Sequence, residues 1–97
     1  MKESEKILKS LEELKGAMFA RYKIKKVGLF GSFIKGEQKE SSDIDILVDF
    51  SEGADLIDFA GLGLFLEERL GRRVDVVPVT ALREELKEAI FREVVYI

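Results

Sequence analysis

The sequence contains no cysteine, no histidine and no tryptophan, and its only proline is Pro78. The absence of cysteine excludes disulfides and thiolate chemistry. Because histidine is absent too, the chain lacks the ligands of the usual zinc sites. Catalysis by a histidine base is excluded for the same reason. A metal ion bound by this chain must therefore be a hard cation held by carboxylates, with Mg²⁺ or Mn²⁺ as the candidates.

Long apolar runs are also missing. No run approaches the roughly 20 residues of a membrane-spanning helix, and the charged N-terminus does not resemble a secretory signal. We therefore expect a cytoplasmic protein that does not contact a membrane. The 97 residues, 46% hydrophobic and 36% charged, predict one folded domain over residues 1–97. Abundant Glu and Lys, no asparagine and a single glutamine resemble the composition of thermophile proteins.

Charge is unevenly distributed along the chain. Residues 1–26 carry eight Lys/Arg and four Glu, whereas residues 27–97 carry eight Lys/Arg and fifteen Asp/Glu. Lys23, Lys25 and Lys26 could contact nucleic acid, but no basic stripe interleaved with aromatic residues accompanies them. A solvated helix end is the simpler interpretation, so nucleic acid is not an expected partner.

Hydrophobic periodicity predicts three helices. The first covers about residues 4–20 with Ser4 as its N-cap, and the second runs from Ala54 or Asp55 to Leu70, where Gly71 ends it. Leu62, Leu64, Phe65 and Leu66 lie on more than one face of this second helix, which fits either a partner surface or a fully buried helix. Thr80 is expected to cap the last helix, whose buried stripe is Leu82, Leu86, Ala89 and Ile90.

Three strands are expected between these helices, at Val27–Phe30, Asp43–Phe50 and Arg73–Val77. A polar loop is expected over residues 31–42, with Phe33 and Ile34 either packing it against the sheet or contacting a partner. The apolar tail 94–97 is expected to form a short strand or to dock on the sheet. The order of elements predicts an α+β fold in which helices pack against a small mixed β-sheet.

Three aspartates are candidate metal ligands because of their positions in the predicted strands. Asp43 and Asp45 share one face of a strand and lie about 6.6 Å apart along it, so both can bind one hard cation or an adjacent pair. The alternative is a solvated strand face. Asp75 interrupts an apolar strand although aspartate is a poor strand former. It could complete a three-carboxylate site if its strand lies beside the first, or it could be an edge charge that blocks aggregation.

The loop before these acids begins with Gly31-Ser32, directly after a buried strand. Glycine lets the backbone approach a ligand closely, and exposed N–H groups with a serine hydroxyl can hold phosphate oxygens. Lys35 could neutralise a phosphate. The spacing of a Walker A loop is missing, and a plain turn explains Gly-Ser equally simply.

Taken in order, Gly31-Ser32-x-x-x-Gly36 followed by Ser42-Asp43-Ile44-Asp45 resembles the signature of the DNA polymerase beta-like nucleotidyltransferases. The resemblance is greatest to the minimal nucleotidyltransferases (MNT), which are encoded beside HEPN-domain partners. It covers nearly the whole chain, including the closing stretch Arg92–Ile97.

The resemblance implies a Mg²⁺-dependent antitoxin that transfers AMP from ATP to a tyrosine of a HEPN-type toxin. It implies that two Mg²⁺ ions are bound at the catalytic carboxylates, with Asp75 helping to deprotonate the attacking hydroxyl. The catalytic and metal-binding residues would be Asp43, Asp45 and Asp75, and the nucleotide-binding residues Gly31, Ser32, Lys35, Gly36 and Ser42.

Two other functions fit the chain. It could be a binding module that neutralises a partner by covering it, although a pure binder has no need of three clustered acids. It could also be a transferase acting on a free small molecule or on RNA, but a chain of this length leaves no room for an acceptor-binding domain. Its homo- or hetero-oligomeric state stays open.

Overall fold

The computed structural model describes all 97 residues and contains a four-stranded mixed sheet with the strand order β3-β2-β1-β4. Strand β1 pairs antiparallel with β2 and β4, while β2 and β3 are parallel and connected through α3. The predicted α+β class is confirmed. In chain order the elements are α1 (Glu3–Arg21), β1 (Ile24–Phe30), α2 (Ser32–Lys35), β2 (Ile44–Phe50), α3 (Leu56–Leu70), β3 (Val74–Pro78), a 3₁₀ turn (Val79–Ala81), α4 (Glu84–Glu93) and β4 (Val95–Tyr96).

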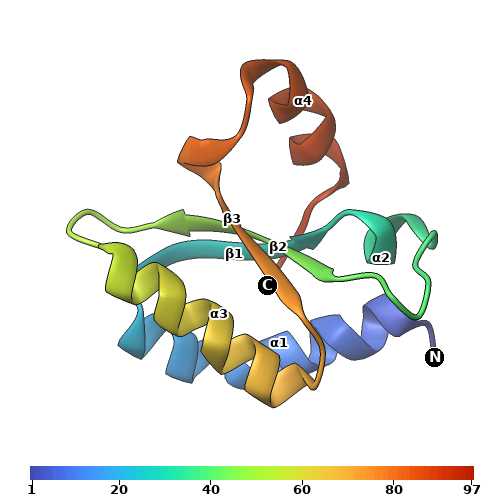
Figure 1. Cartoon of the computed structure of the whole chain (residues 1–97), viewed down its shortest axis with the longest axis horizontal. Coiled ribbons are helices and arrows are strands. Elements are labelled where there is room, and N and C mark those ends of the chain that lie inside the picture. The colour runs from blue at the N-terminus through green and yellow to red at the C-terminus, as the bar shows by residue number, and fades with distance from the viewer.

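The hydrophobic core lies between one face of the sheet and the helices α1 and α3 (Figure 1). Leu11 and Met18 of α1, Ile44 and Ile46 of β2, and Leu62 of α3 have no exposed surface. Burying a side chain of this size stabilises the fold by about 1.5–3 kcal/mol. The opposite face of the sheet is therefore not needed for the main core and is free to carry polar side chains.

The two ends of α3 lie where the sequence predicts them, but the start of α1 does not. Asp55 Oδ1 accepts hydrogen bonds from the N–H groups of Ile57 and Asp58, both at 3.0 Å, and Gly71 ends the helix in a left-handed conformation. The prediction that Ser4 caps α1 is wrong, because the helix begins at Glu3.

The prediction of a polar loop over residues 31–42 is only partly correct. Ser32–Lys35 form one turn of helix, α2, and the side chain of Phe33 is buried there with 2% of its surface exposed. The burial of this aromatic ring stabilises the turn and offsets the entropy cost of ordering so short a segment. Phe33 thus packs the start of the loop against the body of the protein, which was one of the two alternatives for it.

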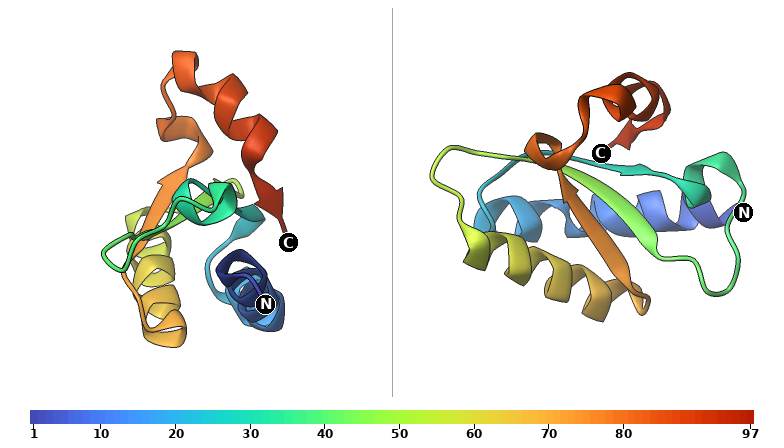
Figure 2. Two further views of the ribbon diagram at one scale, coloured as in Figure 1. Left: turned by 90° about the vertical axis from the view of Figure 1, so that its right-hand side faces the viewer. Right: turned by 45° about the horizontal axis from the view of Figure 1, so that its top comes forward.

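The predicted position of the last helix is wrong in two respects. Thr80 lies in the 3₁₀ turn and caps nothing, and α4 begins only at Glu84. The expected buried stripe is not fully buried either. Helix α4 stands on the face of the sheet opposite α1 and α3 (Figures 1 and 2), so it lies outside the core. The four residues of the predicted stripe, Leu82 before the helix and Leu86, Ala89 and Ile90 within it, are all half-buried or exposed.

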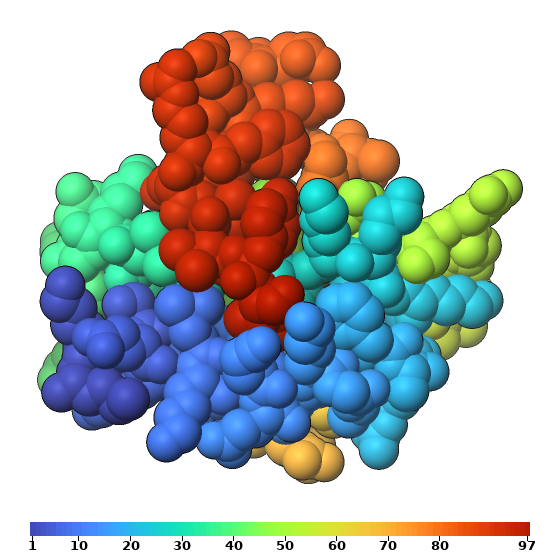
Figure 3. All heavy atoms as spheres, turned by 180° about the vertical axis from the view of Figure 1, so that it is seen from behind, coloured from blue at the N-terminus to red at the C-terminus, as the bar shows by residue number.

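The C-terminal residues return to the sheet as the short strand β4, one of the two expected outcomes. Gly28 and Leu29 of β1 pair with Tyr96 and Val95, and Figure 3 shows this segment lying between α4 and α1. A Cβ on Gly28 would lie 2.7 Å from Val94 Cγ2. The glycine thus lets the end of the chain pack closely on β1, which fixes the last turn of α4.

Helix α3 is buried on one side only. Leu62, Phe65 and Leu66 are buried, whereas 68% of Leu64 is exposed and 81% of both Leu56 and Ile57. Of the two alternatives for this helix, a fully buried helix is therefore excluded, and α3 presents apolar side chains to the outside. None of the helices in the structure has the length and apolar character needed to cross a bilayer.

Candidate active site

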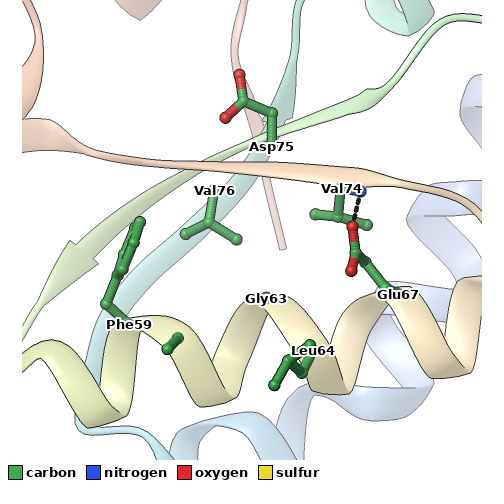
Figure 4. A pocket seen from close by; sticks show the side chains of 8 residues that line it. Phe59, Gly63, Leu64, Glu67, Val74, Asp75 and Val76 are labelled. Carbon is green, nitrogen blue, oxygen red and sulfur yellow. Dashed lines mark hydrogen bonds between the residues drawn. The ribbon is translucent and has the colours of Figure 1, made fainter.

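The parallel pairing of β2 and β3 brings two of the three predicted aspartates together. Asp45 and Asp75 occupy the same position in the register of these neighbouring strands. In Figure 4 the Asp75 side chain points away from α3, whereas Val74 and Val76 point toward it. Because side chains in register on paired strands share a face, Asp45 and Asp75 lie side by side on the face not covered by α1 and α3.

Gly31 is packed directly onto Asp45. Its φ of 80° and ψ of −151° fall in a region that only glycine occupies readily. A Cβ at position 31 would overlap Asp45 Oδ2 and would lie 2.9 Å from Asp45 Cγ. The glycine that the sequence suggested for close approach to a ligand is thus also required by the carboxylate beside it.

The charge of Asp45 is destabilised by its surroundings. Partial burial raises the pKa of this carboxyl above its usual value of 3.8, and the negative charges of Asp75, Asp43 and Glu93 raise it further. A hydrogen bond from the Ser32 backbone N–H opposes them. The site therefore concentrates negative charge that a bound cation would neutralise.

Asp43 lies just before β2, and its side chain is engaged by a neighbour. Arg73 Nε donates to Asp43 Oδ1 at 3.0 Å. As the side chains stand, no three acidic groups converge closely enough to hold a metal ion. Asp45 and Asp75 fit a hard cation by their chemistry and placement, whereas Asp43 would have to leave Arg73 to join them.

Lys35 and Gly36 close the α2 turn. Gly36 adopts a left-handed conformation, and its N–H bonds to the Ser32 carbonyl. Lys35 Nζ lies 3.8 Å from Glu93 Oε2, which belongs to the last turn of α4. Glu93 thus reaches the site from the other end of the chain. Sequence reasoning missed this residue, although an acid on the apolar face of a helix was a signal that could have found it.

The loop between α2 and β2 is held by Arg72, which sequence reasoning also missed. Its Nη2 donates to the carbonyls of Lys39, Glu40 and Ser42 at 3.3, 3.0 and 3.1 Å, and its guanidinium lies 4.9 Å from the centre of the Phe33 ring. The Ser42 hydroxyl accepts from the Lys39 N–H at 2.8 Å. Ser42 therefore shapes the loop in this structure, and its side chain is already in use.

A separate groove lies on the other side of β3, between this strand and α3 (Figure 4). Its volume is about 390 Å³, and its walls are mainly apolar, with Phe59 and Leu64 from α3 and Val74 and Val76 from β3. Glu67 crosses its end to accept a hydrogen bond from the Val74 N–H at 3.0 Å. Asp75 also borders this groove, but its side chain points away from α3, toward the opposite face of the sheet (Figure 4).

The contact between Gly31 and Asp45 predicts a severe effect of Gly31→Ala. The methyl group must displace Asp45 and strain the backbone, at a cost of about 1–3 kcal/mol in folding free energy. Because misplacement by about 1 Å can cost a hundredfold in rate, we expect any activity of this site to fall by about that factor. Denaturant unfolding and a transfer assay measure the two effects.

Gly53→Ala is the control for that substitution. Gly53 has a φ of 90°, but nothing lies within 4 Å of its Cβ position. We expect it to share the backbone penalty of about 1–2 kcal/mol and to keep full activity. Equal activity loss in both variants would mean that backbone strain, and not the contact with Asp45, accounts for the effect.

The raised pKa of Asp45 predicts how stability depends on pH. In metal-free buffer at neutral pH, Asp45→Asn should raise the melting temperature, because it removes a charge that the folded state disfavours. The folded protein binds this proton more tightly than the unfolded chain does. The wild-type penalty therefore disappears as pH falls through the raised pKa toward 3.8, and the two melting temperatures should converge there.

Asp55→Ala should behave in the opposite way. The backbone N–H of Asp58 holds the pKa of the Asp55 carboxyl below its usual value, so this substitution should lower the melting temperature at neutral pH. That loss should shrink as the wild-type carboxyl becomes protonated. A melting temperature of Asp45→Asn that stays equal to wild type from neutral pH to acid would contradict the account of this site.

Comparison with known proteins identifies the family. The profile of the nucleotidyltransferase domain matches residues 4–97. The protein adenylyltransferase MntA of Thermococcus cleftensis is 42% identical over 95 residues, which cover 91% of this chain and 96% of that protein. A solved structure assigned to the minimal nucleotidyltransferases is 41% identical with a TM-score of 0.81, covering 93% of this chain and 92% of the other.

Two solved complexes are also similar. A toxin–antitoxin complex with AMP-PNP contains a chain that is 28% identical, with a TM-score of 0.67 and coverage of 97% and 71%. The tri-AMPylated HEPN toxin of Shewanella oneidensis in complex with its MNT antitoxin gives 25% identity, a TM-score of 0.59 and coverage of 96% and 66%. The chain therefore belongs to the nucleotidyltransferase domain family, and within that family to the minimal nucleotidyltransferases.

Proposed function

We propose that this nucleotidyltransferase is an antitoxin that transfers AMP from ATP, with Mg²⁺, to a tyrosine hydroxyl of a HEPN-type toxin. Adenylyl transfer to protein is supported by the name of the Thermococcus cleftensis relative. Binding of an adenine nucleotide is supported by the similar complex with AMP-PNP. A HEPN toxin as acceptor is supported by the AMPylated toxin found with a similar MNT protein.

The observation that carries this proposal is the pairing of Asp45 with Asp75 next to Gly31. Two carboxylates in register on adjacent strands provide oxygen ligands for a hard cation. The α2 turn begins at Gly31, which packs against Asp45. The residues proposed to bind phosphate and those proposed to bind the cation are therefore adjacent, which the transfer of a nucleotide requires.

In the proposed reaction the acceptor hydroxyl oxygen attacks the α-phosphorus of ATP. The bond between the α-phosphorus and the bridging oxygen breaks, and pyrophosphate leaves with that oxygen. Asp75, the exposed member of the pair, takes the proton of the hydroxyl. A bound Mg²⁺ supplies charge stabilisation at the phosphates and lowers the pKa of the attacking group.

The other residues of the chain bind and orient the nucleotide in this proposal. Asp45 holds the cation, and Asp43 joins it after releasing Arg73. Lys35 contributes a positive charge for the phosphates from the end of the α2 turn. Its ammonium is a point charge without the bidentate fork of arginine, so it can shift from Glu93 to a phosphate oxygen without needing one fixed geometry.

Labelled ATP tests the proposal directly. The protein, Mg²⁺ and the HEPN-domain protein encoded beside it are incubated together, and the label on the partner is measured. We expect wild type to label the partner and Asp43→Asn to reduce labelling by at least about 100-fold, since even an outer-shell substitution at a metal site can cost that much. The matched control is Asp49→Asn, farther along the same strand, which should label normally.

The competing function, a binding module without catalysis, predicts a different result. It is favoured by the exposed apolar side chains Leu56, Ile57 and Leu64 of α3, which could cover a partner. In that case the toxin would be neutralised without ATP, and equally well by Asp43→Asn. Neutralisation of that kind, with no label on the partner, would overturn the enzymatic proposal.

A further inference from the structure

Helix α4 has an apolar stripe that the fold leaves largely uncovered. Leu86, Ala89 and Ile90 follow the i, i+3, i+4 spacing of one helix face. No residue of α4 is fully buried, and 47% of Leu86 is exposed. An amphipathic helix normally buries such a stripe against its own domain, so its purpose here requires another explanation.

Glu93 shows which way this stripe faces. It follows Leu86 by seven residues, Ala89 by four and Ile90 by three, and therefore lies on the same side of the helix. Glu93 Oε2 has no solvent contact and no hydrogen-bond partner within the chain, and it lies 3.8 Å from Lys35 Nζ. Its charge also acts on Asp45. The stripe thus lies on the side of α4 from which Glu93 reaches toward Lys35 and Asp45, while Leu86 stays partly open to solvent.

The course of the chain ties both ends of α4 to the sheet, through the 3₁₀ turn before the helix and through β4 after it. Helix α4 follows the turn at the carboxyl end of β3, and the 3₁₀ turn contacts β2. The helix then ends at Glu93, near Asp45 and Lys35. Leu86 lies about 10.5 Å before Glu93 along the helix axis. The stripe therefore extends along α4 from the residues proposed to bind phosphate and the cation toward the turn that follows β3.

We propose that Leu86, Ala89 and Ile90 of α4 bind the nucleobase of the nucleotide substrate. This inference rests on the proposed function, because it needs a nucleotide held by its phosphates near Asp45 and Lys35. A nucleobase is flat and largely apolar, so it can cover side chains that the protein leaves uncovered. A stable protein–protein contact requires about 800 Å² from each partner, which is more than three side chains can supply.

Two ligands separate the base from the phosphates. The first is α,β-methylene-ATP, whose α–β bridge cannot be cleaved by nucleotidyl transfer, and the second is inorganic tripolyphosphate, which has no base. Calorimetric titration with Mg²⁺ present measures the affinity of wild type, Leu86→Ala and Phe91→Ala for each. Phe91 is the matched control, because 44% of it is exposed on the opposite side of the same helix.

We expect Leu86→Ala to weaken binding of α,β-methylene-ATP by about five- to tenfold. Its affinity for tripolyphosphate should equal that of wild type, and Phe91→Ala should bind both ligands normally. Thermal melting checks that the variants stay folded. Equal weakening by Leu86→Ala for both ligands would overturn the inference, as would unchanged affinity for both.

Failure of the proposed function gives a different pattern from failure of this inference. If wild type bound neither α,β-methylene-ATP nor tripolyphosphate, the nucleotide site itself would be refuted, and the inference with it. If Leu86→Ala kept its nucleotide affinity but no longer formed a complex with the HEPN-domain protein, the stripe would be a protein-binding surface. That outcome would refute the base-binding role and leave the proposed reaction intact.

Discussion

The close packing of Gly31 on Asp45 is the constraint on which the candidate site depends. It requires a residue without a side chain, in a backbone conformation open mainly to glycine, at the end of β1. This packing places the start of the α2 turn next to the Asp45 carboxylate on β2. Asp75 then lies beside Asp45 through the parallel register. The core on the other face of the sheet supports this cluster of like charges.

The parts of the structure that could be predicted from the sequence are those set by local patterns. Strand β2 follows from the alternation around Asp45, and α3 from the cap at Asp55 and the stop at Gly71. The adjacency of Asp75 to Asp45 needed one further assumption, that their strands pair, and the structure confirms it. Period, caps and stops are encoded in neighbouring residues, so they can be identified without the fold.

The rest depends on contacts between distant residues. Helix α4 has a regular apolar stripe, but its position on the face opposite the core cannot be predicted from its own residues. That position is set by β4 and the 3₁₀ turn at its two ends. The roles of Arg72 and Glu93 likewise arise from packing between residues that are 30 or more positions apart in the chain, Arg72 on the loop carbonyls and Glu93 beside Lys35. Their side chains are ordinary charged residues in sequence, and only the fold makes them part of the site.

The central claim is that Asp45 and Asp75 act together as one site for a hard cation. The most direct test is thermal melting of wild type and Asp75→Asn across a Mg²⁺ titration at constant ionic strength. The account predicts that Mg²⁺ raises the melting temperature of wild type in a saturable way, since binding to the folded state stabilises it, and that Asp75→Asn loses most of this rise. An equal rise in both proteins, or no rise in wild type, would contradict it.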